Sequence, residues 1–441
     1  MLKDRYGNSV STSNAAALAH YDEALELISL YRGDPVAALD RAIGEDAGFG
    51  SAWAARAGLL AQQTDRALLE EANRSIAAGS AASLTEADRM HLVAVRDWHD
   101  GRFHDSTTRY ARIARENPRD LVAQQYAHLG CFFLGLQFEL RDAPLQALRA
   151  FSRGDTGYGP LLGMAAFGLE ECGDFARAQA LGEEAVLIDP RDGWAVHAVA
   201  HVHEMRGDLD HGIPWLADSA RHWAPESGFA FHNWWHLALL HLDRGDTAQV
   251  LRLYDECIRP NPEADVILEW LDASAILWRL RLEGVDTGDR FARLASCWER
   301  AAEQGIYAFN DLHAVMAFIG AGRINDAERT IRTMREVACR NDDNGAMTRE
   351  VGLPLAEAFL DFDAGRYQGA AEKILKVRSI AQRFGGSHAQ RDIITLTAIH
   401  AALRGGMRSL SQALASERVQ QKPRSPWAGR LARQASAMKT A

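Results

Sequence analysis

The sequence predicts an all-α protein built from repeated helix pairs, and three observations support this prediction. Amphipathic helical periodicity recurs along the chain, as in AALAHYDEALELI and AAFGLEECGDFARAQALGEEAV, whereas alternating strand-like runs are nearly absent. A glycine followed by Asp or Arg closes one amphipathic stretch after another, at Gly33, Gly101, Gly173, Gly207, Gly245, Gly322 and Gly365. The spacing is regular, because Gly173 and Gly207 are 34 residues apart and Gly33 and Gly101 twice that distance.

A period of 34 residues is that of tetratricopeptide repeats, in which each repeat is a pair of antiparallel helices. Glycine suits the end of the first helix because it reaches the left-handed conformation without strain. A small or short residue five positions later lets the two helices approach, and Pro118, Pro190 and Pro262 are placed to end second helices. The first helices are expected at 15–32, 50–63, 86–100, 119–136, 159–172, 192–206, 228–244, 262–283, 308–321, 346–364 and 388–404.

These elements predict a tetratricopeptide-like solenoid, a right-handed superhelix of roughly ten helix pairs, over residues 15–418. Residues 1–14 are expected to form an N-terminal extension, and the basic residues 419–441 a C-terminal tail that forms either a loose cap or a flexible end.

The amino-acid composition restricts which binding partners and which cellular compartment are expected. The 441 residues carry a net charge of −10, which argues against binding to a nucleic-acid backbone. No apolar run has the length of a membrane span, and the start lacks the apolar core of a signal peptide. The five scattered cysteines contain no C-x-x-C pair, which favours reduced thiols. A cytoplasmic protein without nucleic-acid or membrane partners is therefore expected, and its oligomeric state is left open.

The segment 192–244 concentrates histidines at helical spacing. His197, His201 and Glu204 share one helix face, and His232 and His236 repeat the spacing on the next first helix. Neighbouring first helices lie side by side in stacked repeats, so these four histidines are expected to face one interior. They suit a divalent transition metal or acid–base catalysis. Ordinary packing is the alternative, since tryptophans surround them and H-E-x-x-H is missing, while His203 and His211 are expected to be solvated.

Two later segments add polar residues at helix starts. FNDLHAVMAF contributes Asn310, Asp311 and His313, and GGSHAQRD contributes His388, Gln390, Arg391 and Asp392 behind an N-cap serine. A helix N-terminus with an arginine nearby is a natural anion site. Arg391 is accordingly expected to be at least half buried and either paired with Asp311, Asp392 or Glu204 or open to an anion pocket.

Six strings in order carry a family resemblance: YGPLLGMAAFGLEE, DGWAVHAVAHVHEM, HNWWHLALLHLDRGD, LYDECI, FNDLHAVMAF and GGSHAQRD. From about residue 10 to 405 the chain closely resembles the tetratricopeptide repeat protein 38 family. The resemblance implies a soluble helical-repeat protein and no settled activity. The family positions it carries over are His197, His201, Glu204, His232, Asn233, Trp235, His236, Asn310, Asp311, His313, His388, Gln390, Arg391 and Asp392.

These residues lead to a functional hypothesis: a histidine-rich pocket on the concave face that binds a small anionic ligand, with or without a metal. The four histidines would be metal ligands or acid–base groups, and whether the protein is an enzyme is left open. Glu204 and Asp311 would orient imidazoles, while Arg391 would hold the anion. The alternative is a protein–protein adaptor that binds a peptide segment in the solenoid groove.

Overall fold

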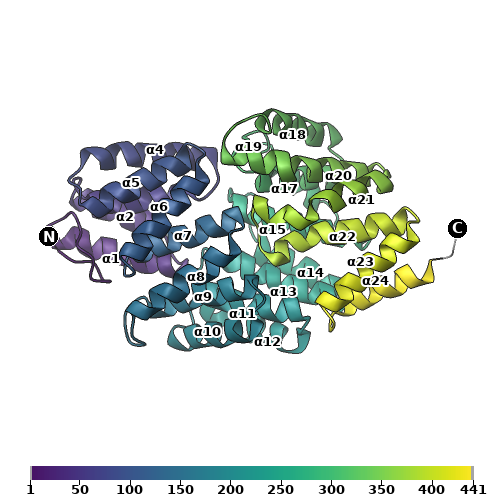
Figure 1. Ribbon diagram of the computed structural model, residues 1–441, viewed down its shortest axis with the longest axis horizontal. Coiled ribbons are helices and arrows are strands. Elements are labelled where there is room, and N and C mark those ends of the chain that lie inside the picture. The colour runs from purple at the N-terminus through teal and green to yellow at the C-terminus, as the bar shows by residue number, and fades with distance from the viewer. Residues whose placement is uncertain (1, 439–441) are drawn as a thin grey trace. The chain divides into compact units, whose positions relative to one another are not determined.

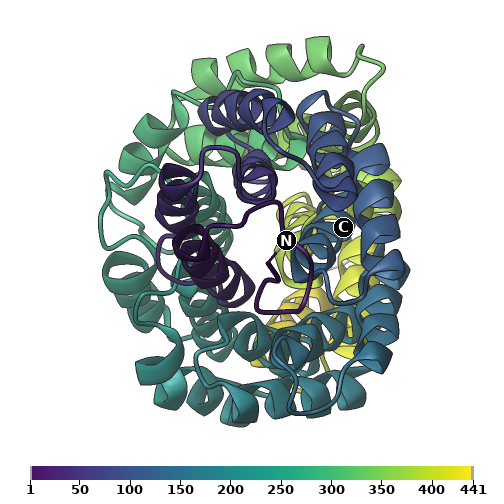
Figure 2. The same cartoon turned by 90° about the vertical axis from the view of Figure 1, so that its left-hand side faces the viewer.

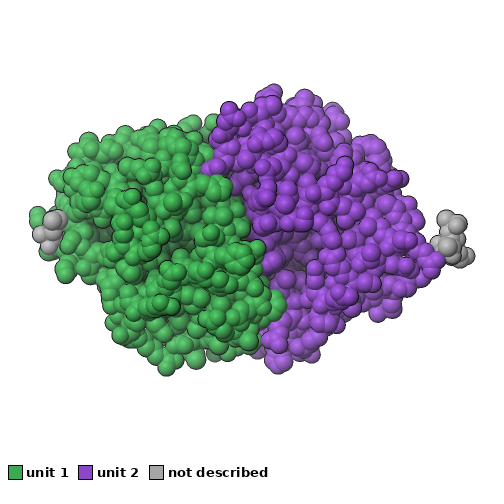
Figure 3. Space-filling model, in the orientation of Figure 1, with its two compact units in different colours: residues 1–199, 220–229 green, residues 200–219, 230–441 purple. Residues whose placement is uncertain are grey.

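The computed structural model describes residues 2–438 and divides the chain into two compact units (Figure 3). Unit 1 comprises residues 1–199 and 220–229, and unit 2 comprises residues 200–219 and 230–441. The division cuts helices α11 (Gly193–Arg206) and α12 (Leu209–Trp223), so each of these helices contributes to both units.

Unit 1 is built from ten helices that precede the shared pair (Figure 1). They are α1 (Ala15–Leu30), α2 (Pro35–Glu45), α3 (Gly50–Ala61), α4 (Arg66–Ala81), α5 (Glu86–His99), α6 (Phe103–Glu116), α7 (Leu121–Leu134), α8 (Gln137–Ala147), α9 (Tyr158–Glu171) and α10 (Phe175–Ile188). Consecutive helices pack against each other as antiparallel hairpins, the arrangement that short glycine-containing connections require.

Unit 2 continues the same pattern through α13 to α24. The helices are α13 (Ala230–Arg244), α14 (Thr247–Leu253), α15 (Ile267–Leu282), α16 (Arg290–Trp298), α17 (Ala308–Gly320), α18 (Ile324–Val337), α19 (Asp343–Met347), α20 (Leu353–Asp363), α21 (Tyr367–Val377), α22 (His388–Arg404), α23 (Arg408–Gln421) and α24 (Pro426–Ala437). Two π-helical turns interrupt it, at Tyr254–Ile258 and Thr348–Gly352.

The predicted helices, and the glycines predicted to end them, are confirmed. Three-quarters of the chain is helical, and neither view of the described residues contains a strand (Figures 1 and 2). All seven glycines that the repeat pattern singled out have positive φ, from 56° at Gly33 to 96° at Gly245. The small residues five positions later are buried, including Ala38, Ala178 and Ala327. The chain therefore has an all-α helical-repeat fold of the tetratricopeptide type.

Of the two expectations for the C-terminal segment, the flexible end is wrong, because the segment is helical and packed. Helix α23 continues to Gln421, and α24 covers Pro426–Ala437 with Trp427 and Leu431 buried. Pro426 lies in the first turn of α24, where a backbone N–H would have no partner within the helix. The proline-containing stretch therefore starts a helix. Among the described residues, no helix has both the length and the apolar character needed to cross a membrane.

A buried histidine cluster as candidate functional site

Three of the predicted histidines meet inside unit 2. His201 comes from α11, and His232 and His236 come from successive turns of α13. The ring centroids of His201 and His236 lie 4.4 Å apart, and those of His232 and His236 4.9 Å apart. One ring nitrogen of each histidine lies within 4.8 Å of the others, and all three side chains are buried. The i, i+4 spacing brings His232 and His236 together, and the packing of α11 adds His201.

Two of these imidazoles are held by buried carboxylates. His232 Nδ1 lies 2.7 Å from Asp272 Oδ2 on α15, and His236 Nδ1 lies 3.0 Å from Glu204 Oε2 on α11. Lys422 Nζ donates to the second Glu204 oxygen at 3.1 Å, which anchors that carboxylate. A carboxylate at Nδ1 favours the tautomer with the proton on Nδ1, which leaves a lone pair on Nε2.

The cluster is electrostatically suited to neutral imidazoles. Burial lowers the pKa of His236 well below its ordinary value of 6.5, and the fields of His201 and His232 lower it further. A histidine that ligates a metal must be neutral, because a protonated ring nitrogen has no lone pair to give. The ring of Trp235 stacks on His232 at 5.3 Å and closes one side of the cluster.

A buried arginine lies beside the histidines and was missed in the sequence. Arg279 of α15 is 1% exposed and lies over the Trp235 ring at 5.4 Å. Its guanidinium donates to the carbonyls of Ala275 at 3.0 Å and Ala389 at 2.6 Å. Among the described residues, no carboxylate lies within 4.0 Å of it. Burial lowers its pKa to about 10, so Arg279 remains a cation at neutral pH.

The partner predicted for Arg391 is corrected by the structure. Arg391 is partly buried, donates to the Gly386 carbonyl and lies 3.5 Å from His388 Nδ1. Asp392 instead forms a two-pronged pair with Arg418 of α23, at 2.5 and 3.0 Å. Arg418 holds the pKa of Asp392 well below its ordinary value. Asp392 and Glu204 thus pair with Arg418 and Lys422, and within the described residues Asp311 forms no ion pair.

Asp311 and His313 are buried in α17 but do not act as predicted. Asp311 is not bonded to an imidazole, and no described residue bonds its side chain; burial raises its pKa to about 8. The role expected of Asp311 belongs to Asp272. His313 Nδ1 donates to the Phe309 carbonyl at 2.7 Å, and burial lowers its pKa to about 4. Asn310 is buried on the same helix.

Three other predicted site residues, Gln390, Asn233 and His388, lie in or next to helices of unit 2. Gln390 completes a capping box with Ser387, since the Ser387 N–H donates to Gln390 Oε1 at 3.0 Å and the Gln390 N–H to Ser387 Oγ at 3.2 Å. This bond accounts for Gln390 without a ligand. Asn233 is fully buried in α13. His388 is partly buried at the start of α22, the helix whose Ala389 carbonyl receives Arg279.

His197 lies one helical turn before His201 on α11 and belongs to unit 1. There its ring packs against the rings of Phe167, Trp194 and Phe229, at 5.2, 5.0 and 5.1 Å. Of the two histidines expected in solvent, the side chain of His211 is 71% exposed. The expectation for His203 is wrong, because this side chain is buried, with Nδ1 3.7 Å from Asp208.

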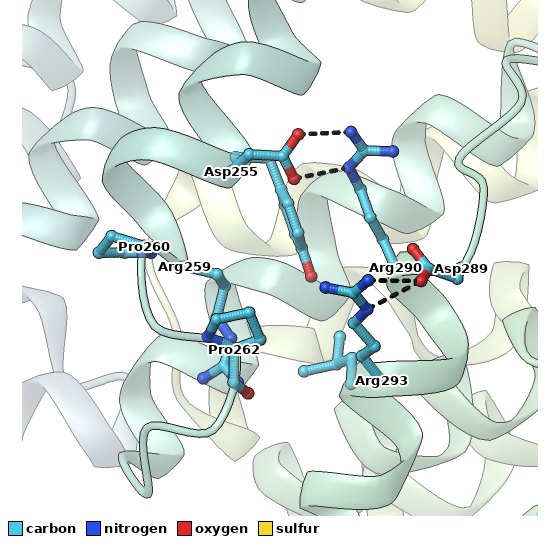
Figure 4. Close-up of a pocket in the computed structure, with 9 residues that line it drawn as sticks. Asp255, Arg259, Pro260, Pro262, Asp289, Arg290 and Arg293 are labelled. Carbon is cyan, nitrogen blue, oxygen red and sulfur yellow. Dashed lines mark hydrogen bonds and ion pairs between the residues drawn. The ribbon is translucent and has the colours of Figure 1, made fainter.

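A separate hollow of about 350 Å³ in unit 2 is lined by arginines (Figure 4). It adjoins the π-helical turn of the string LYDECI, and none of its lining residues was predicted as a site residue. Arg290 pairs with Asp255 at 2.9 and 2.5 Å, and Arg293 pairs with Asp289 at 2.8 Å (Figure 4). Because both arginines already have carboxylate partners, the hollow is weaker than the histidine cluster as a ligand site.

The residues missed in the sequence share a recognisable pattern. Asp272 and Arg279 are seven positions apart on α15, so both lie on one face of a helix that is otherwise apolar there. Charged residues on an apolar face are unusual without partners, and this signal was available. Arg418 and Lys422 gave no such signal, since Arg418 lies in the polar helix α23 and Lys422 begins the basic stretch that follows it.

Fold and cluster together define a class: a helical-repeat protein of the tetratricopeptide type with a buried histidine cluster. No protein-family model matches the chain. Among solved structures, the chain is similar to human IFIT1 in a dimer with m7Gppp-AAAA, at a TM-score of 0.44 and 13% sequence identity. The match covers 97% of this chain and 95% of that one.

Proposed function

We propose that unit 2 contains a transition-metal centre that binds a small anionic ligand. The ligands are the Nε2 atoms of His232 and His236 and a ring nitrogen of His201. We further infer, from the six sequence strings, membership in the tetratricopeptide repeat protein 38 family.

One observation carries the metal proposal. Two neighbouring buried histidines each have Nδ1 bonded to a buried carboxylate, Asp272 and Glu204. This carboxylate–histidine arrangement is typical of metal ligands, because it fixes the ring and makes Nε2 more basic. A histidine that only fills space in a core needs no carboxylate at Nδ1. Two carboxylate-bound histidines next to a third imidazole are therefore more than core packing requires. Imidazole ligands select Zn²⁺, Ni²⁺, Co²⁺ or Cu²⁺ over Mg²⁺ and Ca²⁺.

Arg279 supports the anionic ligand. A buried guanidinium without a carboxylate in contact is costly, and an anion at the metal would compensate its charge. The same cation–π contact that holds Arg279 over Trp235 places it next to the His232 and His236 rings. The anion site predicted at Arg391 is therefore reassigned to Arg279, and the metal would supply a Lewis acid beside it.

The direct test is calorimetric titration of the metal-stripped full chain with Zn²⁺, Co²⁺ and Ni²⁺. The wild type should bind one ion per chain, and His236→Gln should weaken the binding about 100-fold or more. His211→Gln is the matched control, because this histidine is exposed in the same unit and pairs with Asp208. Equal binding by all three proteins, or none by the wild type, would reject the metal centre.

Anion binding is tested separately. Phosphate, sulfate and short dicarboxylates are titrated into the metal-loaded protein and into Arg279→Gln, with circular dichroism to check the fold. Loss of anion binding with the metal retained supports the assignment of Arg279. If Arg279→Gln binds the anion as the wild type does, the anion site does not include Arg279.

A further inference from the structure

Unit 1 contains an acidic cavity that the histidine cluster does not use. Its volume is about 310 Å³, within the range of small-molecule sites. The N-terminal segment 4–10, helix α1, helix α3 and the first turns of α5 and α7 form its walls. Every one of these elements belongs to unit 1, so the cavity is complete within that unit.

The charges in the wall are predominantly negative. Asp4, Asp88 and Asp120 line the cavity, and Glu86 joins them with an exposed side chain. His91 Nε2 lies 2.8 Å from Asp120 Oδ2, and Asp120 raises the pKa of His91 against the effect of burial, so these two form an ion pair. Neither lysine nor arginine lines the cavity.

Asp4 and Asp88 therefore remain without a cationic partner in the wall. Asp4 accepts from the N–H groups of Tyr6 and Asn8 at 2.9 and 2.8 Å, and Asp88 accepts from the Thr85 N–H at 2.8 Å. These neutral donors hold the carboxylates in place without balancing their charge. Burial raises the pKa of Asp4, the sign of a carboxylate that lacks a compensating cation.

An unpartnered hydroxyl adds a second observation. Tyr21 is 6% exposed and lines the cavity, yet none of the described residues bonds its hydroxyl. Burial raises the pKa of Tyr21, and the fields of Asp4, Asp120 and Asp88 raise it further. Because Tyr21 lines the cavity, a ligand bound there would supply the missing partner of its hydroxyl.

The carboxylates are too dispersed for a metal ion. Within the described residues, the acidic and histidine side chains of this cavity do not bring three ligand atoms within 4.8 Å of one another. A divalent metal needs such a group, whereas an elongated organic cation can reach carboxylates on separate walls. The rings of Tyr6 and Tyr21 also offer aromatic surface, which favours an ammonium group.

We propose that the cavity between the N-terminal segment and the first turns of α5 and α7 binds a small organic dication, a linear diamine. One ammonium group pairs with Asp4 and the other with Asp88, and the Tyr21 hydroxyl accepts a hydrogen bond from an ammonium N–H. This site is independent of the metal centre, since the two share no residue.

The test is calorimetric titration of the full chain with putrescine and cadaverine, with the neutral 1,4-butanediol and with Mg²⁺ and Ca²⁺ as comparisons. A diamine should bind, butanediol should not, and Asp88→Asn should weaken the diamine about tenfold or more. Asparagine keeps an acceptor for the Thr85 N–H, so the helix cap survives. Tyr21→Phe, which removes only the hydroxyl, should also weaken binding.

Asp174→Asn is the matched control, because Asp174 caps α10 in the same unit and lies outside the cavity. It should bind the diamine as the wild type does, and so should His236→Gln. No diamine binding by the wild type, equal binding by Asp88→Asn and Asp174→Asn, or preference for Mg²⁺ or Ca²⁺ would each overturn the proposal.

Discussion

His128 of unit 1 and His236 of unit 2 are both buried histidines in the interiors of their units, but their contacts differ. His236 has a carboxylate at Nδ1 and two imidazoles around it. His128 contacts the rings of Phe167 and Trp194, and neither of its ring nitrogens is bonded to a described residue. Burial is therefore common to both histidines, and the orienting carboxylate is what distinguishes His236 from His128.

The same contrast extends to the surroundings. Phe167 and Trp194 belong to an apolar cluster with Leu140 and Cys131, which explains the ring contacts of His128. The carboxylate of Glu204 that holds His236 pairs with Lys422. Lys422 in turn lies 4.0 Å from Asp392, the partner of Arg418. Unit 1 is thus expected to tolerate loss of the buried histidine, whereas unit 2 depends on its ionic partners.

The largest effect is expected from breaking the ionic partnership in unit 2. Asp392→Ala leaves Arg418 buried without its carboxylate, which should lower the free energy of unfolding by about 3–5 kcal/mol. Urea denaturation of the wild type and the variant measures this difference in the free energy of unfolding. A loss below about 1 kcal/mol would mean that the pair is not what holds α22 to α23.

The second prediction concerns acid stability and His128. Burial lowers the pKa of His128 to about 3 in the folded protein, against an ordinary 6.5. The neutral ring favours the fold above pH 6.5, and this contribution is lost as the pH falls from 6.5 towards 3. His128→Leu should remove that loss, so that between pH 6.5 and 4.5 the variant gains roughly 2–3 kcal/mol over the wild type. Parallel pH profiles of the two proteins would contradict the apolar surroundings of His128.

The third prediction sharpens the role of the orienting carboxylate. Asp272→Asn keeps the shape at His232 but removes the charge, and should weaken metal binding about 10- to 100-fold. His128→Leu should leave the metal affinity unchanged. If both variants bind metal like the wild type, the carboxylates do not distinguish the two histidines.

The smallest effect is expected at Asp311. Its pKa is raised by burial to about 8, so the folded protein holds the neutral acid while the unfolded chain ionises near pH 3.8. Stability from this group is complete below pH 3.8 and is lost as the pH rises through 8. Between pH 4 and pH 5 the wild type should therefore lose roughly 1–2 kcal/mol that Asp311→Asn keeps, and the two proteins should show parallel profiles below pH 4. A destabilised variant at pH 8 would show that Asp311 has an ionic role.

The fold could be predicted in detail because its signals are local. Glycines with positive φ, small residues at close helix approaches and the 34-residue spacing fixed the first helices nearly to their observed bounds. Part of the candidate site could also be predicted from local sequence, because the i, i+4 spacing puts His232 and His236 on one face of α13.

The remainder of the site depends on contacts between distant helices. Glu204 meets Lys422 over 218 positions, and His232 meets Asp272 over 40. Nothing in the local pattern of either partner specifies such a pairing. Arg391 illustrates the error this causes: its partner was sought among Asp311, Asp392 and Glu204, whereas Asp392 is held by Arg418 at the very end of the predicted solenoid.

The most direct measurement is an anomalous difference map from crystals of the full chain grown with Zn²⁺ or Co²⁺. The metal proposal predicts one strong peak about 2.0–2.2 Å from Nε2 of both His232 and His236, with His201 as a further ligand. A crystal of His236→Gln should lack that peak. A map without a peak among these histidines, or with metal only at the exposed His211, would contradict the metal centre.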